Sequence, residues 1–445
     1  MKQILKDFLT YAKMNTRSDA TSQQIPTTPG QVELALLLKD QLTEMGLSDV
    51  VYHEKNSFVI GRLPGNPEKE AIGFIAHVDT ADFAAENIQP QIHENYDGQD
   101  VVLNQEQQLM MRVAEFPNLT DYIGQTLITT DGTTLLGADD KAGIAEIIDA
   151  VRILQKQDPQ QRGDVWVAFG PDEEIGLGAD RFDPADFPVA FAYTMDSGRI
   201  GHMEFETFNA ARIDITIHGT SVHPGTAYGR LVNALKIAHQ IDAALPAAEV
   251  PELTKDYQGF YLLHNLSGHI GQAEVSYIIR DHDHQQFEQR KENMVAIIAA
   301  LNSQYGQERI TYTLYDQYYN MGDLIKEDPR SIEAARAAMK AIGITPIEEP
   351  FRGGTDGSKI TYKGIPTPNL FTGGENFHGQ YEFITVEAME TARDLIVAIV
   401  EHVGKEDTTV SYRTRQHARL MRKSLACFFV LLQGRTASER TFFFW

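Results

Sequence analysis

Cysteine is almost absent from this sequence, and so are long apolar stretches. The one cysteine, Cys427, has no second cysteine with which to form an internal disulfide bond. Even the apolar run at residues 425–432 is far shorter than the ~20 residues that span a bilayer. Residues 1–7 lack the apolar core of a signal peptide. These absences exclude a disulfide-built scaffold and a membrane-spanning helix, and they favour a cytoplasmic protein.

Positive charge is also scarce. Lys and Arg number 39 against 62 Asp and Glu, which gives a formal net charge of -23. Such an acidic chain repels phosphate backbones and anionic membranes, so neither nucleic acid nor a membrane is expected as a partner. With 445 residues, of which 42% are hydrophobic, the chain can bury more than one core, and two domains are expected.

The first part of the sequence alternates between strand and helix patterns. Three short apolar runs predict buried strands, each followed directly by polar or acidic residues: 71–76, 165–169 and 191–195. Apolar residues at helical spacing predict helices over three further segments: 4–12, 28–45 and 141–154. This alternation predicts an open α/β sheet.

The pattern changes near Phe208. Residues 213–217 alternate between Ile and polar side chains, which is typical of a strand with one wet face. The segments that follow read as a helix at 231–245, strands at 259–266 and 273–279, a helix with Phe287, Met294, Ile298 and Leu301 inward, and a strand at 309–315. This β-α-β-β-α-β order predicts a ferredoxin-like α+β domain at 208–320, inserted in a discontinuous α/β domain of residues 1–207 and 321–404.

Residues 405–445 differ from the rest of the chain. Arginine recurs there, the sign of the charge reverses, and the sequence closes on Phe-Phe-Phe-Trp. We expect a disordered or artefactual extension, such as the product of a shifted reading frame, and leave it out of the fold.

A histidine and an aspartate follow the first predicted strand. His77 and Asp79 lie two residues apart, so an extended chain can direct both side chains to the same face. Ligand sites of open α/β sheets lie beyond the carboxyl ends of the strands. His77 is therefore a candidate metal ligand, with Asp79 holding its other ring nitrogen. The plainer alternative is a strand-end histidine that is only hydrogen-bonded.

Adjacent carboxylates open the helix at 141–154. Asp139 and Asp140 follow Leu-Leu-Gly-Ala. One Asp suffices to cap a helix, and this is the structural alternative. The second Asp is then free to face the edge of the sheet.

Further acids and a second histidine follow later strands. Asp172, Glu173 and Glu174 are consecutive, and such carboxylates repel one another unless a cation or protonation relieves them. Asp196 ends the strand at 191–195, and His378 lies in a glycine-rich loop. A solvated acidic loop is the alternative for the run of acids. Two histidines and several carboxylates at separate strand ends are together the ligand inventory of a two-metal hydrolase.

Eight strings of the sequence resemble one family closely, in order and at the family's intervals over residues 1–403. They are GFIAHVDT, TLLGADDKAGIAE, PDEEIG, YTMDSG, SVHPGTA, YIIRDHD, FRGGTDGS and NLFTGGENFHG. They are similar to the di-zinc metallopeptidase family that includes carboxypeptidase G and aminoacylase. The resemblance implies an aminopeptidase that releases the N-terminal residue of tripeptides, with two Zn²⁺ per subunit.

The resemblance also implies a role for each residue at the metals. His77 and Asp196 would hold one zinc, Glu174 and His378 the other, and Asp139 would bridge them. Asp79 would support His77, and Glu173 would deprotonate the bridging water. Imidazole and carboxylate ligands also accept Co²⁺ or Mn²⁺, so the sequence leaves the metal open.

Three accessory residues follow from the same resemblance. His223, in the inserted domain, would stabilise the oxyanion, often at the site of a neighbouring subunit, which implies a homodimer through that domain. Arg352 would clamp the substrate carboxylate, with help from Arg280. The alternative for these residues is an ordinary surface role.

Three functions stay open on the sequence alone. The first is hydrolysis of tripeptides, and the second is hydrolysis of dipeptides or N-acyl amino acids by a related enzyme. The third is a peptide-binding relative without activity, which would lack a base or a ligand. The local chemistry of the first two is the same, and only the resemblance favours tripeptides.

Overall fold

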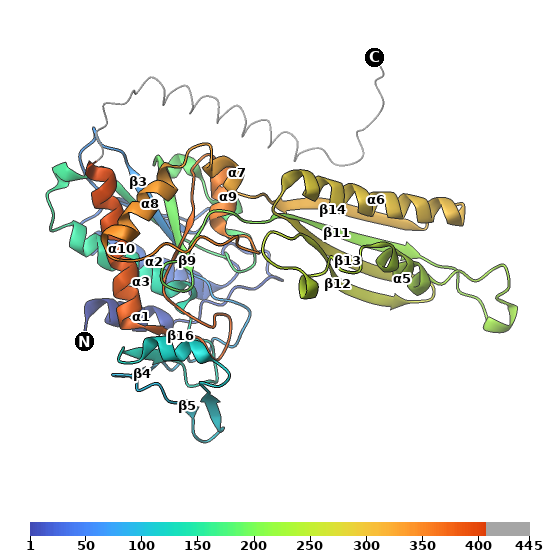
Figure 1. Ribbon diagram of the computed structural model, residues 1–445, viewed down its shortest axis with the longest axis horizontal. Coiled ribbons are helices and arrows are strands. Elements are labelled where there is room, and N and C mark those ends of the chain that lie inside the picture. Colours follow the sequence, from blue (N-terminus) through green and yellow to red (C-terminus); the bar gives the residue numbers. More distant parts are fainter. Residues whose placement is uncertain (406–445) are drawn as a thin grey trace, which may run out of the picture. The chain divides into compact units, whose positions relative to one another are not determined.

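The structure is a computed structural model that describes residues 1–405 (Figure 1). The predicted tail, apart from Lys405, lies outside these residues. The described chain divides into two compact units. Unit 1 comprises Met1–Glu204, Leu324–Glu348 and the residues from Thr355 onward, and unit 2 comprises Phe205–Asp323 and Glu349–Gly354.

A seven-stranded sheet forms the centre of unit 1. Its strands are, in spatial order, β1 (Ser48–His53), β2 (Phe58–Leu63), β8 (Val165–Gly170), β3 (Ile72–His77), β9 (Phe191–Ser197), β15 (Asn369–Phe371) and β10 (Met203–Glu204). The inner strands β8, β3, β9 and β15 run parallel to one another, whereas β1, β2 and β10 each pair antiparallel with the strand beside them. The predicted open α/β sheet is confirmed, with the three expected strands as its adjacent members β8, β3 and β9.

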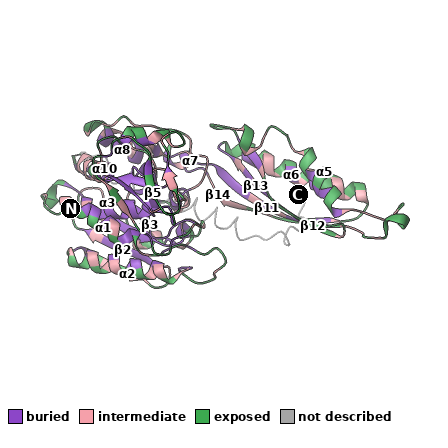
Figure 2. Cartoon of the chain, turned by 90° about the horizontal axis from the view of Figure 1, so that it is seen from below, coloured by how far each residue is buried: buried purple, intermediate pink, exposed green. Residues whose placement is uncertain are grey.

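The inner strands are apolar because both of their faces are covered. All six residues of β3 are buried, as a parallel strand between two layers requires. Figure 2 shows buried residues throughout this strand and exposed ones on α2. Helix α3 packs on β3 and β9, and α2 packs on β1 and β2. The helices of unit 1 are α1 (Gln3–Ala12), α2 (Pro29–Glu44), α3 (Ala138–Leu154), α4 (Gly178–Arg181), α8 (Arg330–Ala341), α9 (Asp356–Tyr362) and α10 (Val386–Lys405).

Two small sheets extend unit 1. One has the order β16 (Phe383–Thr385), β7 (Leu127–Thr129), β4 (Gln91–His93), and the other pairs β5 (Val101–Asn104) with β6 (Leu109–Met111). A separate core beneath them includes Tyr96, Leu119, Tyr122 and Phe383. Sequence patterns did not predict these strands of three or four residues, which are too short to show a period.

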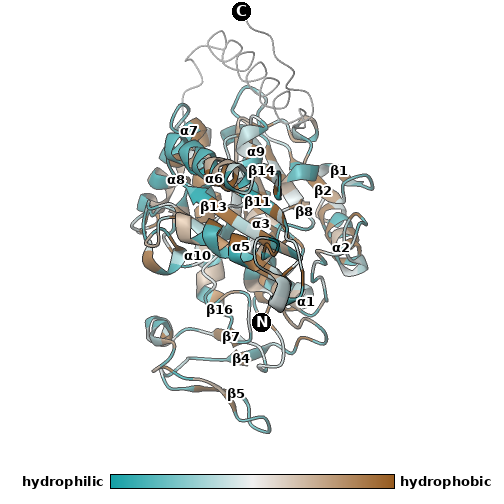
Figure 3. Ribbon diagram, turned by 90° about the vertical axis from the view of Figure 1, so that its right-hand side faces the viewer, coloured by the Kyte–Doolittle hydropathy of each residue, from teal (hydrophilic) through white to brown (hydrophobic). Residues whose placement is uncertain are grey.

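Unit 2 is a four-stranded antiparallel sheet with two helices. The strand order is β12 (Phe260–His269), β13 (Gln272–Asp281), β11 (Asn209–His218), β14 (Ile310–Tyr318). Helices α5 (Ala234–Ala244) and α6 (His284–Tyr305) share a buried core with the sheet. The outer face of α6 is hydrophilic, as its teal colour in Figure 3 shows. This order is the one expected of a ferredoxin-like module.

The boundaries of unit 2 differ from the range 208–320 read from the sequence. Residues Glu349–Gly354 also belong to it, because the Phe351 N–H donates to the Glu206 carbonyl and the Phe208 N–H donates to the Gly353 carbonyl. The short helix α7 (Gly322–Ile325) lies at the chain's exit from the unit. Among residues 1–405, none of the helices has the length and apolar character needed to cross a membrane.

Candidate metal centre

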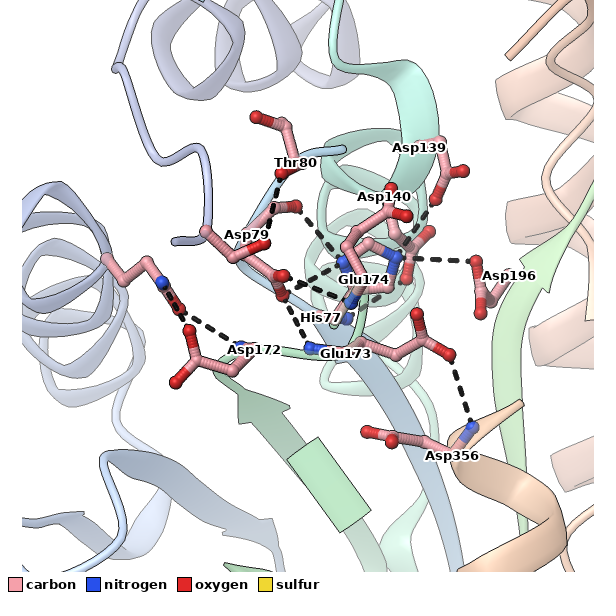
Figure 4. Close-up of polar contacts among 12 residues, drawn as sticks. His77, Asp79, Thr80, Asp139, Asp140, Asp172, Glu173, Glu174, Asp196 and Asp356 are labelled. Carbon is pink, nitrogen blue, oxygen red and sulfur yellow. Dashed lines mark hydrogen bonds and ion pairs between the residues drawn. The ribbon is translucent and has the colours of Figure 1, made fainter. Parts of the chain in front are cut away.

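His77 lies at the carboxyl end of β3 and is buried. Its Nε2 is 2.9 Å from an Asp139 oxygen and 3.4 Å from an Asp196 oxygen, contacts that Figure 4 marks with dashed lines. Because β3 and β9 are parallel neighbours, the ends of both strands deliver their side chains to the same edge of the sheet. Among residues 1–405, His77, Asp139 and Asp196 form the first of two groups with the geometry to hold a metal ion.

Asp139 is shared between the two groups. Its Oδ1 faces His77, and its Oδ2 is 2.9 Å from Nε2 of His378. Asp139 and Asp140 have non-helical backbone angles and are joined by a cis peptide bond, so the regular part of α3 begins after them. The neighbouring carboxylate of Asp140 turns inward and accepts the His77 backbone N–H at 3.1 Å.

Glu174 and His378 complete the second group with Asp139. Oε1 of Glu174 lies 3.2 Å from Nε2 of His378. The side chain of His378 is 55% exposed. Its loop is anchored through Glu375, whose carboxylate accepts hydrogen bonds from Tyr122 and Asn118. The loop that delivers the second histidine therefore contacts residues 117–122 and, through the bridge between Glu375 and Phe383, β16.

The three consecutive acids after β8 do not share one environment. Asp172 has a φ of 57° and is fully buried, where it accepts hydrogen bonds from Thr27 and Gln31 and pairs with Arg181. Glu173 and Glu174 instead lie next to the candidate metal ligands (Figure 4). Arg181 therefore neutralises part of the negative charge of the run, and no local sequence pattern marks this ion pair.

Asp79 holds the backbone of these two glutamates. Its carboxylate oxygens accept the N–H groups of Glu173 at 2.9 Å and Glu174 at 3.1 Å. Nδ1 of His77 lies 3.0 Å from the Asp79 carbonyl oxygen and 3.4 Å from its carboxylate. Asp79 therefore contacts both the first histidine and the segment of the two glutamates.

Glu173 belongs to neither group of candidate ligands among the described residues. Its carboxylate accepts the N–H of Asp356, at the start of α9, at 3.3 Å (Figure 4). Burial, together with the negative charges of Asp196 and Asp356, holds the pKa of Glu173 well above its ordinary value. A carboxyl group with a raised pKa beside ligands of this kind suits proton transfer.

The electrostatics of the site favour a bound cation. Burial raises the pKa of Asp196 to about 8, and burial with the nearby Asp139 raises that of Glu174. Burial alone would lower the pKa of His77, but Asp196 and Asp139 outweigh it and hold the pKa well above its usual range. Oε1 of Glu174 is buried and faces Nε2 of His378 at 3.2 Å. Divalent cations would neutralise this concentration of carboxylates, so the donor set fits two metal ions.

Three predicted site residues belong to unit 2. His223 is exposed, and its Nδ1 accepts the Gly225 N–H. Arg280 donates to the Ala211 carbonyl, and its guanidinium lies 5.3 Å from the ring centre of Tyr318. The roles proposed for these two side chains stay predictions.

Arg352 is held within unit 2. Its guanidinium donates to the carbonyls of Asp256 and Gln258 and to the hydroxyl of Thr254, each at 2.8 Å. It also lies over the rings of Phe208 and Phe260. A role in carboxylate binding stays a prediction for Arg352 as well.

The comparisons with known proteins agree with this fold. Residues 130–402 match the model of Peptidase family M20/M25/M40. The chain belongs to this family, whose peptidases are hydrolases. A relative from Fusobacterium nucleatum named Peptidase T is 54% identical over 396 residues, covering 88% of this chain and 96% of the relative. Peptidase T of Enterococcus faecalis is 54% identical over 403 residues, covering 90% and 98%.

Solved structures show the same fold. Aminopeptidase PepT from Bacillus cereus matches with a TM-score of 0.73 at 23% identity, over 91% of this chain and 98% of that one. A dinuclear metal binding peptidase of the M20 family from Bacillus subtilis matches with a TM-score of 0.61 at 15% identity, over 89% and 97%.

Proposed function

We propose that this chain is a cytoplasmic two-metal aminopeptidase that releases the N-terminal residue of tripeptides. The observation that carries the proposal is the pair of ligand groups joined by Asp139, with Glu173 beside them and outside both. The name Peptidase T on relatives with 54% identity supports the substrate class.

The proposal gives each residue of the centre a task. His77 and Asp196 would hold one ion and Glu174 and His378 the other, with Asp139 contributing to both groups. Two bound ions, Zn²⁺ in our proposal, would polarise the scissile carbonyl and activate a water molecule. Glu173 would accept a proton from the attacking water and return it to the leaving amine. Asp79 keeps the two glutamates and His77 in place through the contacts described above.

Unit 1 is the catalytic domain in this proposal, and unit 2 is a lid that also forms a homodimer. His223 stabilises the oxyanion, and Arg352, assisted by Arg280, binds the C-terminal carboxylate of the peptide. A related hydrolase of dipeptides or N-acyl amino acids would share the metal centre. Only the preferred substrate therefore distinguishes the two functions. Rates on matched di-, tri- and tetra-alanine and on N-acetylalanine test it, and faster hydrolysis of dialanine or N-acetylalanine would contradict the proposal.

Loss of Arg352 should abolish discrimination between free-acid and amidated tripeptides. Hydrogen bonds to charged groups contribute roughly 1.5–3 kcal/mol, so Arg352→Ala should raise KM for the free acid by about 10- to 100-fold. Because Arg352 also supports residues 254–258, both substrates are measured on both proteins. A structural effect would raise KM for the acid and the amide alike, and that result would rule out the clamp.

Full activity should require two metal ions per chain, since the centre has two ligand groups. Protein treated with a chelator and titrated with Zn²⁺ should regain tripeptide hydrolysis up to a break at about two equivalents. Co²⁺ and Mn²⁺ should also restore activity because they accept the same ligands. A break at one equivalent would contradict the two-metal assignment.

A further inference from the structure

The buried carboxylate of Glu382 faces the segment that ends in Asp139. Glu382 precedes β16 and is 1% exposed. Its Oε2 accepts the backbone N–H groups of Leu136 at 2.9 Å and Gly137 at 2.8 Å, and its Oε1 accepts the N–H of Asp139 at 3.0 Å. One side chain thus binds three backbone N–H groups of a segment that lies some 245 positions earlier in the sequence.

The backbone of this segment is shaped to meet the carboxylate. Gly137 has a φ of 78°, in the left-handed region that glycine adopts readily. Consecutive N–H groups in such a turn converge on an anion. The last of them belongs to Asp139, whose two carboxylate oxygens face His77 and His378. Glu382 therefore fixes the peptide group from which the shared ligand projects.

The same glutamate closes the loop of His378. Its own N–H donates to the Gly379 carbonyl at 3.2 Å, and the next residue, Phe383, exchanges two backbone hydrogen bonds with Glu375. His378 lies between these anchors. Glu382 is thus covalently part of the segment that carries one ligand and hydrogen-bonded to the segment that carries another.

A buried lysine lies close to the same segment. Lys141 is fully buried, and its Nζ donates to the Met14 carbonyl at 2.7 Å. A buried carboxylate that accepts several hydrogen bonds is held in place more firmly than an exposed one.

We propose that Glu382 is a positioning residue that sets the Asp139 carboxylate and the His378 imidazole at the separation that the second metal ion needs. The inference rests on the proposed two-metal function and adds a residue to it. Glu382 acts through the backbone N–H groups of the segment that leads to Asp139 and through the loop of His378.

Glu382→Gln tests the inference. Gln has the same shape, but its NH₂ group must face N–H donors where an oxygen accepted them. Loss of a group that orients ligands typically lowers metal affinity by about 10- to 100-fold. We expect a loss of this size for one of two Zn²⁺ ions, a changed visible spectrum of the Co²⁺ form, and a lower kcat with KM nearly unchanged.

Glu387→Gln is the matched control. Glu387, five residues on, also joins distant segments, because its carboxylate accepts the N–H and the hydroxyl of Thr126. The Glu387→Gln substitution should lower the melting temperature of the protein. It should leave the Zn²⁺ affinity and the Co²⁺ spectrum as in the wild type. If Glu382→Gln behaved like this control, Glu382 would be only structural and the inference would be overturned.

A conservative variant covers a failure to fold. Glu382→Asp keeps the charge but shortens its reach, so it should retain more Zn²⁺ affinity than Glu382→Gln and less than the wild type; wild-type affinity and spectrum would overturn the inference. A wild-type chain that bound two ions but cleaved no tripeptide would overturn the proposed function alone, since Glu382 is judged on metal affinity and spectrum. A wild-type chain that bound no divalent ion would overturn both.

Discussion

Glu173→Gln should leave both metal ions bound and almost abolish turnover. Glu173 lies outside both ligand groups, and its carboxylate contacts the Asp356 N–H, which an amide oxygen can still accept. General-base catalysis is typically worth about 10²–10⁴-fold, and this group would both take and return the proton, so the loss in kcat should reach or exceed the upper end. Metal analysis and kcat on a tripeptide measure the two properties separately.

The same substitution one residue later is its control. Glu174 faces His378 at 3.2 Å and belongs to the second ligand group, so Glu174→Gln should lose metal first and activity as a consequence. Near-normal turnover in Glu173→Gln, or a metal-free Glu173→Gln protein, would mean that the roles of the two glutamates are exchanged or that the mechanism differs.

Asp139→Asn should weaken the binding of both ions at once. Each oxygen of Asp139 faces a different histidine, so the neutral amide offers one group an NH₂ that cannot bind a metal ion and the other an uncharged oxygen, and each group keeps a single carboxylate, Asp196 or Glu174. A metal ion contributes several kcal/mol of transition-state stabilisation, so activity should fall by at least roughly 10³-fold. Isothermal titration with Zn²⁺ measures the number of sites and their affinities.

Asp196→Asn provides the comparison, because Asp196 belongs only to the first group. Asp196→Asn should weaken the binding of one metal ion and leave the affinity for the other unchanged. If Asp139→Asn also lost a single ion, Asp139 would not be shared in solution, and the two groups would have to be treated as independent sites.

The parallel sheet explains why much of the candidate site could be predicted. His77 and Asp196 end neighbouring strands that run the same way, so their placement follows from the strand pattern alone. Asp139 precedes the regular part of a long, mostly buried helix that packs on both strands, and the sequence pattern also predicts this helix. The open sheet and the ferredoxin-like order of unit 2 are likewise encoded in local periodicity.

The supporting contacts could not be predicted in the same way. Glu382, Asp356 and Asp172 act on residues far away in the sequence, and no local period marks them. Three adjacent acids could be identified as a cluster, but only the left-handed turn at Asp172 decides which of them points into the body of the protein. Single residues whose partners are set by tertiary packing leave no pattern in the chain.

The spacing of the ligands along the chain has a consequence for biosynthesis. His77, Asp139 and Asp196 all lie in the first half of the sequence. The second group is complete only with His378, close to the end of the described chain, and Glu382 follows four residues later. Chains emerge from the ribosome with the N-terminal part first. A nascent chain can therefore present the first group of candidate ligands long before His378 completes the second, and under the proposed function it becomes competent only after translation has passed Glu382.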